Sequence, residues 1–167
     1  LAPGAELAAE IDPRSLGQGQ LRTLTALGFN RLSLGVQDFE PDVQAKVRRI
    51  QPFALVEEVV KEARTLGVKA LNFDLIYGLP GQTLETMRRT LERVVALAPD
   101  RIAFYRLAVI PEMFKWQRVF SREDLPNGEQ SLQFMLAAIA AFHRDRELAA
   151  RAQPVYHAHF PRFHGAF

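Results

Sequence analysis

Four short apolar runs alternate with longer segments of helical period along the chain. The apolar runs cover residues 7–11, 31–36, 68–76 and 101–108. Their near-continuous apolar content is typical of strands that are buried on both faces, as in a parallel sheet. Between and after them, apolar positions recur three and four residues apart over residues 55–66, 83–98 and 128–142, which predicts helices. The alternation indicates an α/β fold built from βα units.

Local signals refine the predicted helices. Thr83 is expected to cap the second helix, and Glu57 precedes Lys61 by four residues, the favourable order for an ion pair on a helix. The last helix is expected to bury a stripe formed by Leu132, Leu136, Ile139 and Phe142. Periodicity leaves two architectures open, a doubly wound open sheet and a stretch of βα barrel. In both of them, ligands bind at the carboxyl ends of the strands.

Polar residues gather where the predicted strands end. Glu10 could accept hydrogen bonds from hydroxyls or an ammonium group, or it could be a surface carboxylate. Gln37 could bind a ligand with mixed polar groups, or it could belong to a turn. Asp74 interrupts an apolar run, and because a buried carboxylate is costly alone, it needs either a ligand or a neighbouring arginine. Arg49 could clamp a carboxylate, or it could be a solvated cation at a helix end.

Composition excludes several classes of function. The formal net charge is only +2, which predicts no nucleic-acid partner. No apolar run is long enough to span a membrane and no signal peptide is evident, so we expect a soluble cytoplasmic protein. We further expect it to be a monomer that acts on a small-molecule substrate. The chain has no cysteine, which excludes metal sites built from thiolates. His157, His159 and His164 lie close together, but no carboxylate or cysteine at a suitable spacing supports a zinc site.

Four segments in order resemble one known family. They are Glu-Ile-Asp-Pro-Arg at 10–14, the segment 28–39 containing Gly-Val-Gln-Asp-Phe, Val-Arg-Arg-Ile-Gln at 47–51, and the segment 72–83 containing Asp-Leu-Ile-Tyr-Gly-Leu-Pro-Gly-Gln-Thr. Together they look like the oxygen-independent coproporphyrinogen III oxidases of the radical S-adenosylmethionine superfamily. The resemblance implies a partial βα barrel over residues 1–142, equivalent to strands three to six of a six-stranded core. Residues 143–167 depart from the family pattern, and we interpret them as a disordered or frameshifted tail.

The resemblance also implies a cofactor site. In this family S-adenosylmethionine binds beside a [4Fe-4S] cluster and yields a radical that starts the oxidative decarboxylation of coproporphyrinogen III to protoporphyrinogen IX. The positions that contact S-adenosylmethionine match Glu10, Gln37, Arg49 and Asp74, and Ala108 matches a backbone contact. Arg49 would hold the carboxylate of the cofactor, and the other side chains would exchange hydrogen bonds with its polar groups. The resemblance assigns no catalytic side chain and no metal ligand within this chain.

Two departures from the family pattern shape the functional hypothesis. The three cysteines that hold the cluster in the family have no counterpart here, so we expect the isolated chain to be inactive. Leu107 and Val109 stand where many members have tyrosine and histidine. The alternative is a haem chaperone of the same superfamily, which binds and delivers haem. Asp38, where such chaperones typically have serine, favours the oxidase.

Overall fold

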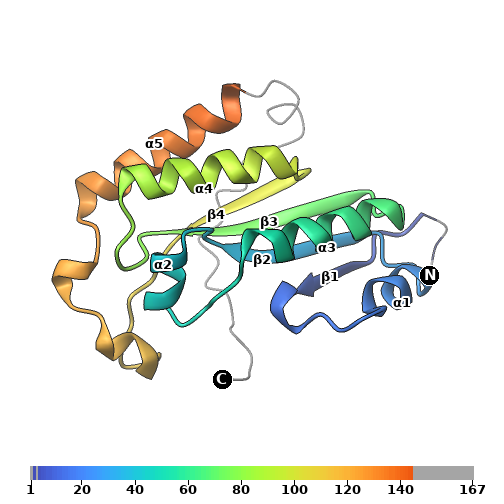
Figure 1. Cartoon of the computed structure of the whole chain (residues 1–167), viewed down its shortest axis with the longest axis horizontal. Coiled ribbons are helices and arrows are strands. Elements are labelled where there is room, and N and C mark those ends of the chain that lie inside the picture. The colour runs from blue at the N-terminus through green and yellow to red at the C-terminus, as the bar shows by residue number, and fades with distance from the viewer. Residues whose placement is uncertain (1, 3, 145–167) are drawn as a thin grey trace.

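The computed structural model describes residue 2 and residues 4–144, and within them the chain forms a parallel sheet covered by helices (Figure 1). The sheet has the order β1-β2-β3-β4 and is not closed. Its strands are β1 (Ala8–Ile11), β2 (Arg31–Gln37), β3 (Ala70–Tyr77) and β4 (Arg101–Arg106). The α-helices are α1 (Gln20–Ala26), α2 (Pro41–Lys46), α3 (Phe53–Thr65), α4 (Leu84–Leu97) and α5 (Gly128–Arg144). Short 3₁₀ helices are η1 (Pro13–Ser15), η2 (Lys115–Val119) and η3 (Arg122–Asp124).

One face of the sheet packs against the helices. Alternate strand residues such as Leu34 and Phe73 are fully buried and join one cluster with Val59 of α3 and Leu91 of α4. Because side chains alternate across a strand, the residues between them point to the other face. That face carries polar groups from neighbouring strands, including Ser33 and its pairing partner Asn72. The parallel strands and their covering helices confirm the predicted α/β fold. The sheet has one face that packs against the helices, the helical face, and one face that carries polar groups, the polar face.

The helix signals in the sequence are largely confirmed. The Thr83 side chain accepts a hydrogen bond from the Thr86 amide and so caps α4. The Lys61 ammonium lies 3.1 Å from the Glu57 carboxylate on α3. The segment 78–83 is a strand-to-helix turn, because β3 ends at Tyr77 and α4 begins at Leu84.

The predicted buried face of α5 is wrong. Leu132 and Leu136 are 50% and 54% exposed, whereas Phe134 and Ala138 are buried. The helix lies beside α4, as Figure 1 shows, with Phe134 in the main core. Only Phe142 of the predicted stripe is among the residues packed against that core. Periodicity located the helix but not its rotation, because apolar residues occupy more than one of its faces.

Three further expectations concern the end of the fourth strand, the C-terminal tail and membrane-spanning segments. The fourth strand ends at Arg106, so Ala108 lies beyond it rather than within it. The expected tail and its three histidines fall at residues that are not described, apart from the end of α5. No helix in the described part of the chain is long and apolar enough to cross a membrane.

Candidate cofactor site

The end of β2 is the centre of the candidate site, and its backbone is irregular there. The pairing of β2 with β3 shifts register between Gly35 and Gln37, and Gly35 is the partner of Asp74. Gln37 has a φ of 65°, in the left-handed region that side-chain-bearing residues rarely adopt. Residues held in such conformations concentrate at binding and catalytic sites. The irregular backbone therefore makes the end of β2 a candidate for a functional site.

Arg49 reaches this strand end from the segment after α2. Its Nη2 donates to the carbonyl of Gly35 at 2.8 Å, and its Nη1 donates to Asp12 Oδ2 at 3.0 Å. Arg48, with a φ of 54°, provides the backbone turn that precedes it. Within the described residues, the Nε of Arg49 is buried without a hydrogen-bond partner. The Arg49 guanidinium is thus fixed by two hydrogen bonds. It is not the solvated cation at a helix end that one interpretation of the sequence allowed.

Asp12, which the sequence did not single out, fixes that guanidinium. It also accepts three hydrogen bonds from the Arg14 side chain, the shortest at 2.7 Å. Burial alone would raise the pKa of Asp12, but the hydrogen bonds from Arg14 and the charge of Arg49 outweigh it and lower the pKa to about 2. Asp12 is therefore ionised at neutral pH, and its negative charge balances the positive charge of Arg49. The contact spans 37 positions of sequence, so no local pattern could reveal it.

Asp74 is held by neutral hydrogen-bond donors. Its Oδ2 accepts from the Ser33 hydroxyl and its Oδ1 from the Asn72 amide, each at 2.8 Å. Among the described residues its side-chain partners are Ser33 and Asn72, not the arginine that one interpretation of the sequence allowed. Burial raises the pKa of Asp74, and the negative charge of Glu10 adds to the rise. A carboxylate whose partners in the described part of the chain are neutral can accept a hydrogen bond from a positively charged or hydroxylic ligand group.

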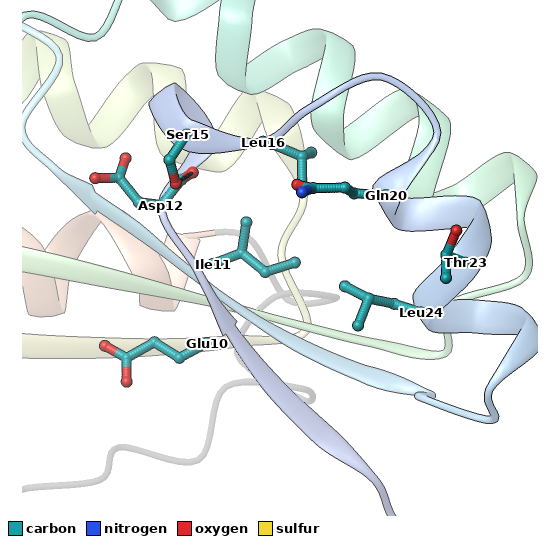
Figure 2. A pocket seen from close by; sticks show the side chains of 8 residues that line it. All are labelled: Glu10, Ile11, Asp12, Ser15, Leu16, Gln20, Thr23 and Leu24. Carbon is teal, nitrogen blue, oxygen red and sulfur yellow. Dashed lines mark hydrogen bonds between the residues drawn. The ribbon is translucent and has the colours of Figure 1, made fainter.

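Glu10 lies on the polar face beside this cluster. Its pairing partner is Ser33, the residue that donates to Asp74. Figure 2 shows its carboxylate on the opposite side of β1 from Ile11 and Leu24. A pocket of about 360 Å³ beside β1 is lined by residues of β1, η1 and α1: Glu10, Ile11, Asp12, Ser15, Leu16, Gln20, Thr23 and Leu24. This pocket adjoins the cluster at Glu10 and Asp12, but most of its lining belongs to the far side of the strand.

Ala108 has a different environment from the other predicted residues. Its carbonyl accepts a hydrogen bond from Gln117 Nε2 at 2.9 Å, and Gln117 Oε1 accepts from the Ile110 amide at 2.6 Å. Gln117 is buried and so fixes the backbone that follows β4. The structure thus gives Ala108 a fixed backbone, while its contact with a cofactor stays a prediction.

A second buried carboxylate holds the strand ends together. Asp38 is 1% exposed and accepts hydrogen bonds from the Glu40 amide, the Gln82 side chain and the Thr90 hydroxyl. These contacts tie the end of β2 to the turn after β3 and to α4. Burial raises the pKa of Asp38 to about 6, against the opposing effect of these donors. Asp38 is therefore a structural anchor behind the site.

The cluster offers the chemistry needed to hold a small zwitterionic ligand. The Arg49 guanidinium suits a carboxylate, the Asp74 and Glu10 carboxylates suit an ammonium or hydroxyl group, and the Gln37 amide suits either. No group of three histidine or acidic side chains in the described part of the chain could hold a metal ion. The sequence has no cysteine either, so its residues do not fit an iron–sulfur cluster.

Known proteins resemble this chain in sequence. The family model described as the radical SAM superfamily matches residues 1–94. Oxygen-independent coproporphyrinogen III oxidase of Helicobacter pylori strain J99 is 47% identical over 135 residues, which cover 81% of this chain and 30% of that protein. The oxidases of Pseudomonas aeruginosa and Escherichia coli K12 are 45% and 43% identical over 75% and 81% of this chain, covering 27% and 30% of their own lengths. The chain thus spans under a third of these relatives.

Solved structures agree with the sequence match. Coproporphyrinogen III oxidase (HemN) from Escherichia coli, described as a radical SAM enzyme, superposes with a TM-score of 0.81 at 42% identity, covering 84% of this chain and 32% of that one. The archaeal Elp3 of Methanocaldococcus infernus has a TM-score of 0.65 at 20% identity over 80% of this chain and 32% of its own, a likeness of fold alone. These matches support the partial barrel inferred from the resemblance. This chain belongs to the radical SAM superfamily.

Proposed function

We propose that this chain forms the S-adenosylmethionine-positioning part of an oxygen-independent coproporphyrinogen III oxidase. The observation that carries the proposal is the meeting of Gln37, Arg49 and Asp74 around Gly35. A Cβ atom built on Gly35 would lie 3.1 Å from Arg49 Nη2 and 3.2 Å from Gln37 Nε2, and Gly35 pairs with Asp74. Three residues far apart in the sequence therefore converge at one strand end, where ligands bind in this class of fold.

Each side chain would have a positioning role. Arg49 would hold the carboxylate of S-adenosylmethionine through guanidinium hydrogens that Asp12 and Gly35 leave free. Asp74 and Glu10 would accept hydrogen bonds from its ammonium or ribose hydroxyls, Gln37 would donate or accept, and the backbone at Ala108 would add a contact. When bound together with a [4Fe-4S] cluster, S-adenosylmethionine supplies the oxidant that converts propionates of coproporphyrinogen III into vinyl groups. The protein side chains orient the ligand through non-covalent contacts and form no covalent bond with it.

The cluster is not assigned to residues of this chain. A [4Fe-4S] cluster is held by cysteine thiolates, and the sequence contains none. We therefore expect the 167-residue chain alone to convert no coproporphyrinogen III while retaining part of the cofactor site. The relatives reported above carry the oxidase name, which favours this function over that of a haem chaperone.

Calorimetric titration with S-adenosylmethionine tests the proposal. In an Asp74→Asn variant, the amide oxygen can still accept from Asn72 and the amide nitrogen can donate to Ser33, so the local fold is preserved. Loss of one charged hydrogen bond to the ligand is expected to weaken binding about tenfold to a hundredfold. The matched control is Asp42→Asn, at an exposed position in the first turn of α2.

Two results would overturn the proposal. Equal affinities of the wild-type and Asp74→Asn chains would show that S-adenosylmethionine binds elsewhere. Absence of binding to a chain that circular dichroism shows to be folded would show that these strands do not hold the cofactor by themselves. Where the wild-type chain binds, Asp42→Asn is expected to bind with the same affinity.

A further inference from the structure

Gly35 lacks a side chain at the point where the site residues meet. A Cβ atom there would face Arg49 Nη2 at 3.1 Å and Gln37 Nε2 at 3.2 Å, separations tighter than ordinary carbon contacts. The third neighbour is the Ile11 carbonyl, 3.9 Å away on the adjacent strand. The space beside Gly35 is therefore occupied by the polar ends of two long side chains.

The backbone of Gly35 does not itself require glycine. Its φ lies outside the left-handed region, unlike that of Gly78 or Gly81 in the turn after β3. An alanine could adopt the same backbone conformation without strain, because only positive φ values favour glycine strongly. The requirement at Gly35 is therefore one of space for its neighbours.

Those neighbours have little freedom to move aside. Arg49 is fixed at both ends of its guanidinium, by Asp12 and by the carbonyl of Gly35 itself, and its side chain is 19% exposed. Gln37 is only two residues along the same strand, after the shift in pairing, and its left-handed backbone fixes the direction of its side chain. A methyl group at Gly35 would have to displace the guanidinium, the amide or both.

We propose that Gly35 is a positioning residue whose missing side chain lets the Arg49 guanidinium lie against the β2 backbone, where it receives the carboxylate of the ligand. This inference rests on the proposed function for the identity of the ligand. Its structural half, that Gly35 sets the place of the Arg49 guanidinium, stands on the contacts alone. Gly35 acts through Arg49, so a change at Gly35 is expected to affect recognition of a carboxylate and not of the nucleoside.

The binding test compares two ligands in the Gly35→Ala variant of the full 167-residue chain. S-adenosylmethionine carries the carboxylate, and 5′-methylthioadenosine lacks it. We expect the affinity for S-adenosylmethionine to fall about tenfold, the value of one charge-assisted contact, and the affinity for 5′-methylthioadenosine to stay the same. Gly128→Ala is the matched control, because a Cβ atom at Gly128 meets nothing within 4 Å. Equal losses for both ligands would overturn the role through Arg49.

A double-mutant cycle adds a readout that a general loss of stability would not give. If Gly35 acts through Arg49, the Gly35→Ala/Arg49→Lys chain should bind S-adenosylmethionine no more weakly than Arg49→Lys alone. Additive losses would contradict the proposal. Should Gly35→Ala fail to fold, the same double variant decides the matter: recovery of folding would place the clash at the guanidinium, and continued failure would place it elsewhere.

A ligand-free measurement separates this inference from the proposed function. The Nε–H of Arg49 is buried, so its NMR signal, assigned with Arg49→Lys, should exchange slowly with water in the wild-type chain. Gly35→Ala is expected to shift that signal and speed its exchange, and Gly128→Ala is expected to leave it unchanged. An Arg49 signal identical in all three chains would overturn the inference, whether or not S-adenosylmethionine binds.

Discussion

At the scale of single residues, Asp74 and Arg49 each have a hydrogen-bond partner far away in the sequence, Ser33 and Asp12 respectively. Asp74 stood out because a carboxylate in an apolar run needs compensation. Its actual donors, Ser33 and Asn72, lie on the same sheet face but are polar residues of common types, with no local signal to mark them. The contact between Asp12 and Arg49 likewise depends on how β1 and the segment after α2 meet in space. Such pairings are set by the tertiary fold and are invisible to sequence spacing.

Asp38 gives a prediction about pH at this scale. The unfolded chain ionises it near the ordinary pKa of 3.8, whereas the folded chain keeps the proton until about pH 6. The folded state therefore binds more protons between these values, and the contribution of Asp38 to stability falls by about 3 kcal/mol as pH rises through them. In Asp38→Asn this titration is absent. The amide also cannot accept from Gln82 without turning, so the variant is expected to be less stable at pH 4.

Urea unfolding of both chains at pH 4, 5, 6 and 7 measures the effect. The difference in unfolding free energy between the wild-type chain and Asp38→Asn should be largest at pH 4 and should shrink towards pH 7. Titration of Asp74 and of other groups is common to both chains and cancels in the difference. A difference that stays constant or grows with pH would contradict the assigned protonation of Asp38.

At the scale of elements, the periodicity of apolar residues located the strands and the longer helices, but it missed a short helix with few buried residues. The helix α1 was not predicted, because only Leu21 within it is buried and its first turn has no side-chain cap. In α5 the large apolar residues misled the prediction. Ser131, Phe134 and Ala138 are buried while Leu132 and Leu136 are exposed. Periodicity fixes the existence of a helix more firmly than its rotation.

Alanine substitutions on the two faces of α5 test its observed rotation. Phe134→Ala removes a side chain that is 1% exposed and is expected to cost about 3–5 kcal/mol of unfolding free energy. Leu136→Ala removes one that is 54% exposed and is expected to cost less than about 1 kcal/mol. Chemical denaturation followed by circular dichroism measures both. A larger loss from Leu136→Ala would mean that α5 buries the face that periodicity first suggested.

At the scale of the whole molecule, the four-stranded sheet of the described residues is open and does not close into a barrel. Within the described residues β1 pairs only with β2 and β4 only with β3, so each has an edge without a strand partner. Hydrophobic periodicity could not distinguish this partial barrel from a doubly wound sheet, because both architectures use buried parallel strands. The choice depended on four motifs in order and is supported by the superposition on the Escherichia coli oxidase.

The account depends most on where S-adenosylmethionine binds, and NMR of the isotopically labelled 167-residue chain addresses this directly. Amide signals would be followed as S-adenosylmethionine is added to saturation. Shifts are expected at Gly35, Gln37 and Asp74 on the polar face, and none at Val59 or Leu91 on the helical face. Shifts confined to the helical face or to α1, or a spectrum that does not change, would contradict the assignment of this strand end as the cofactor site.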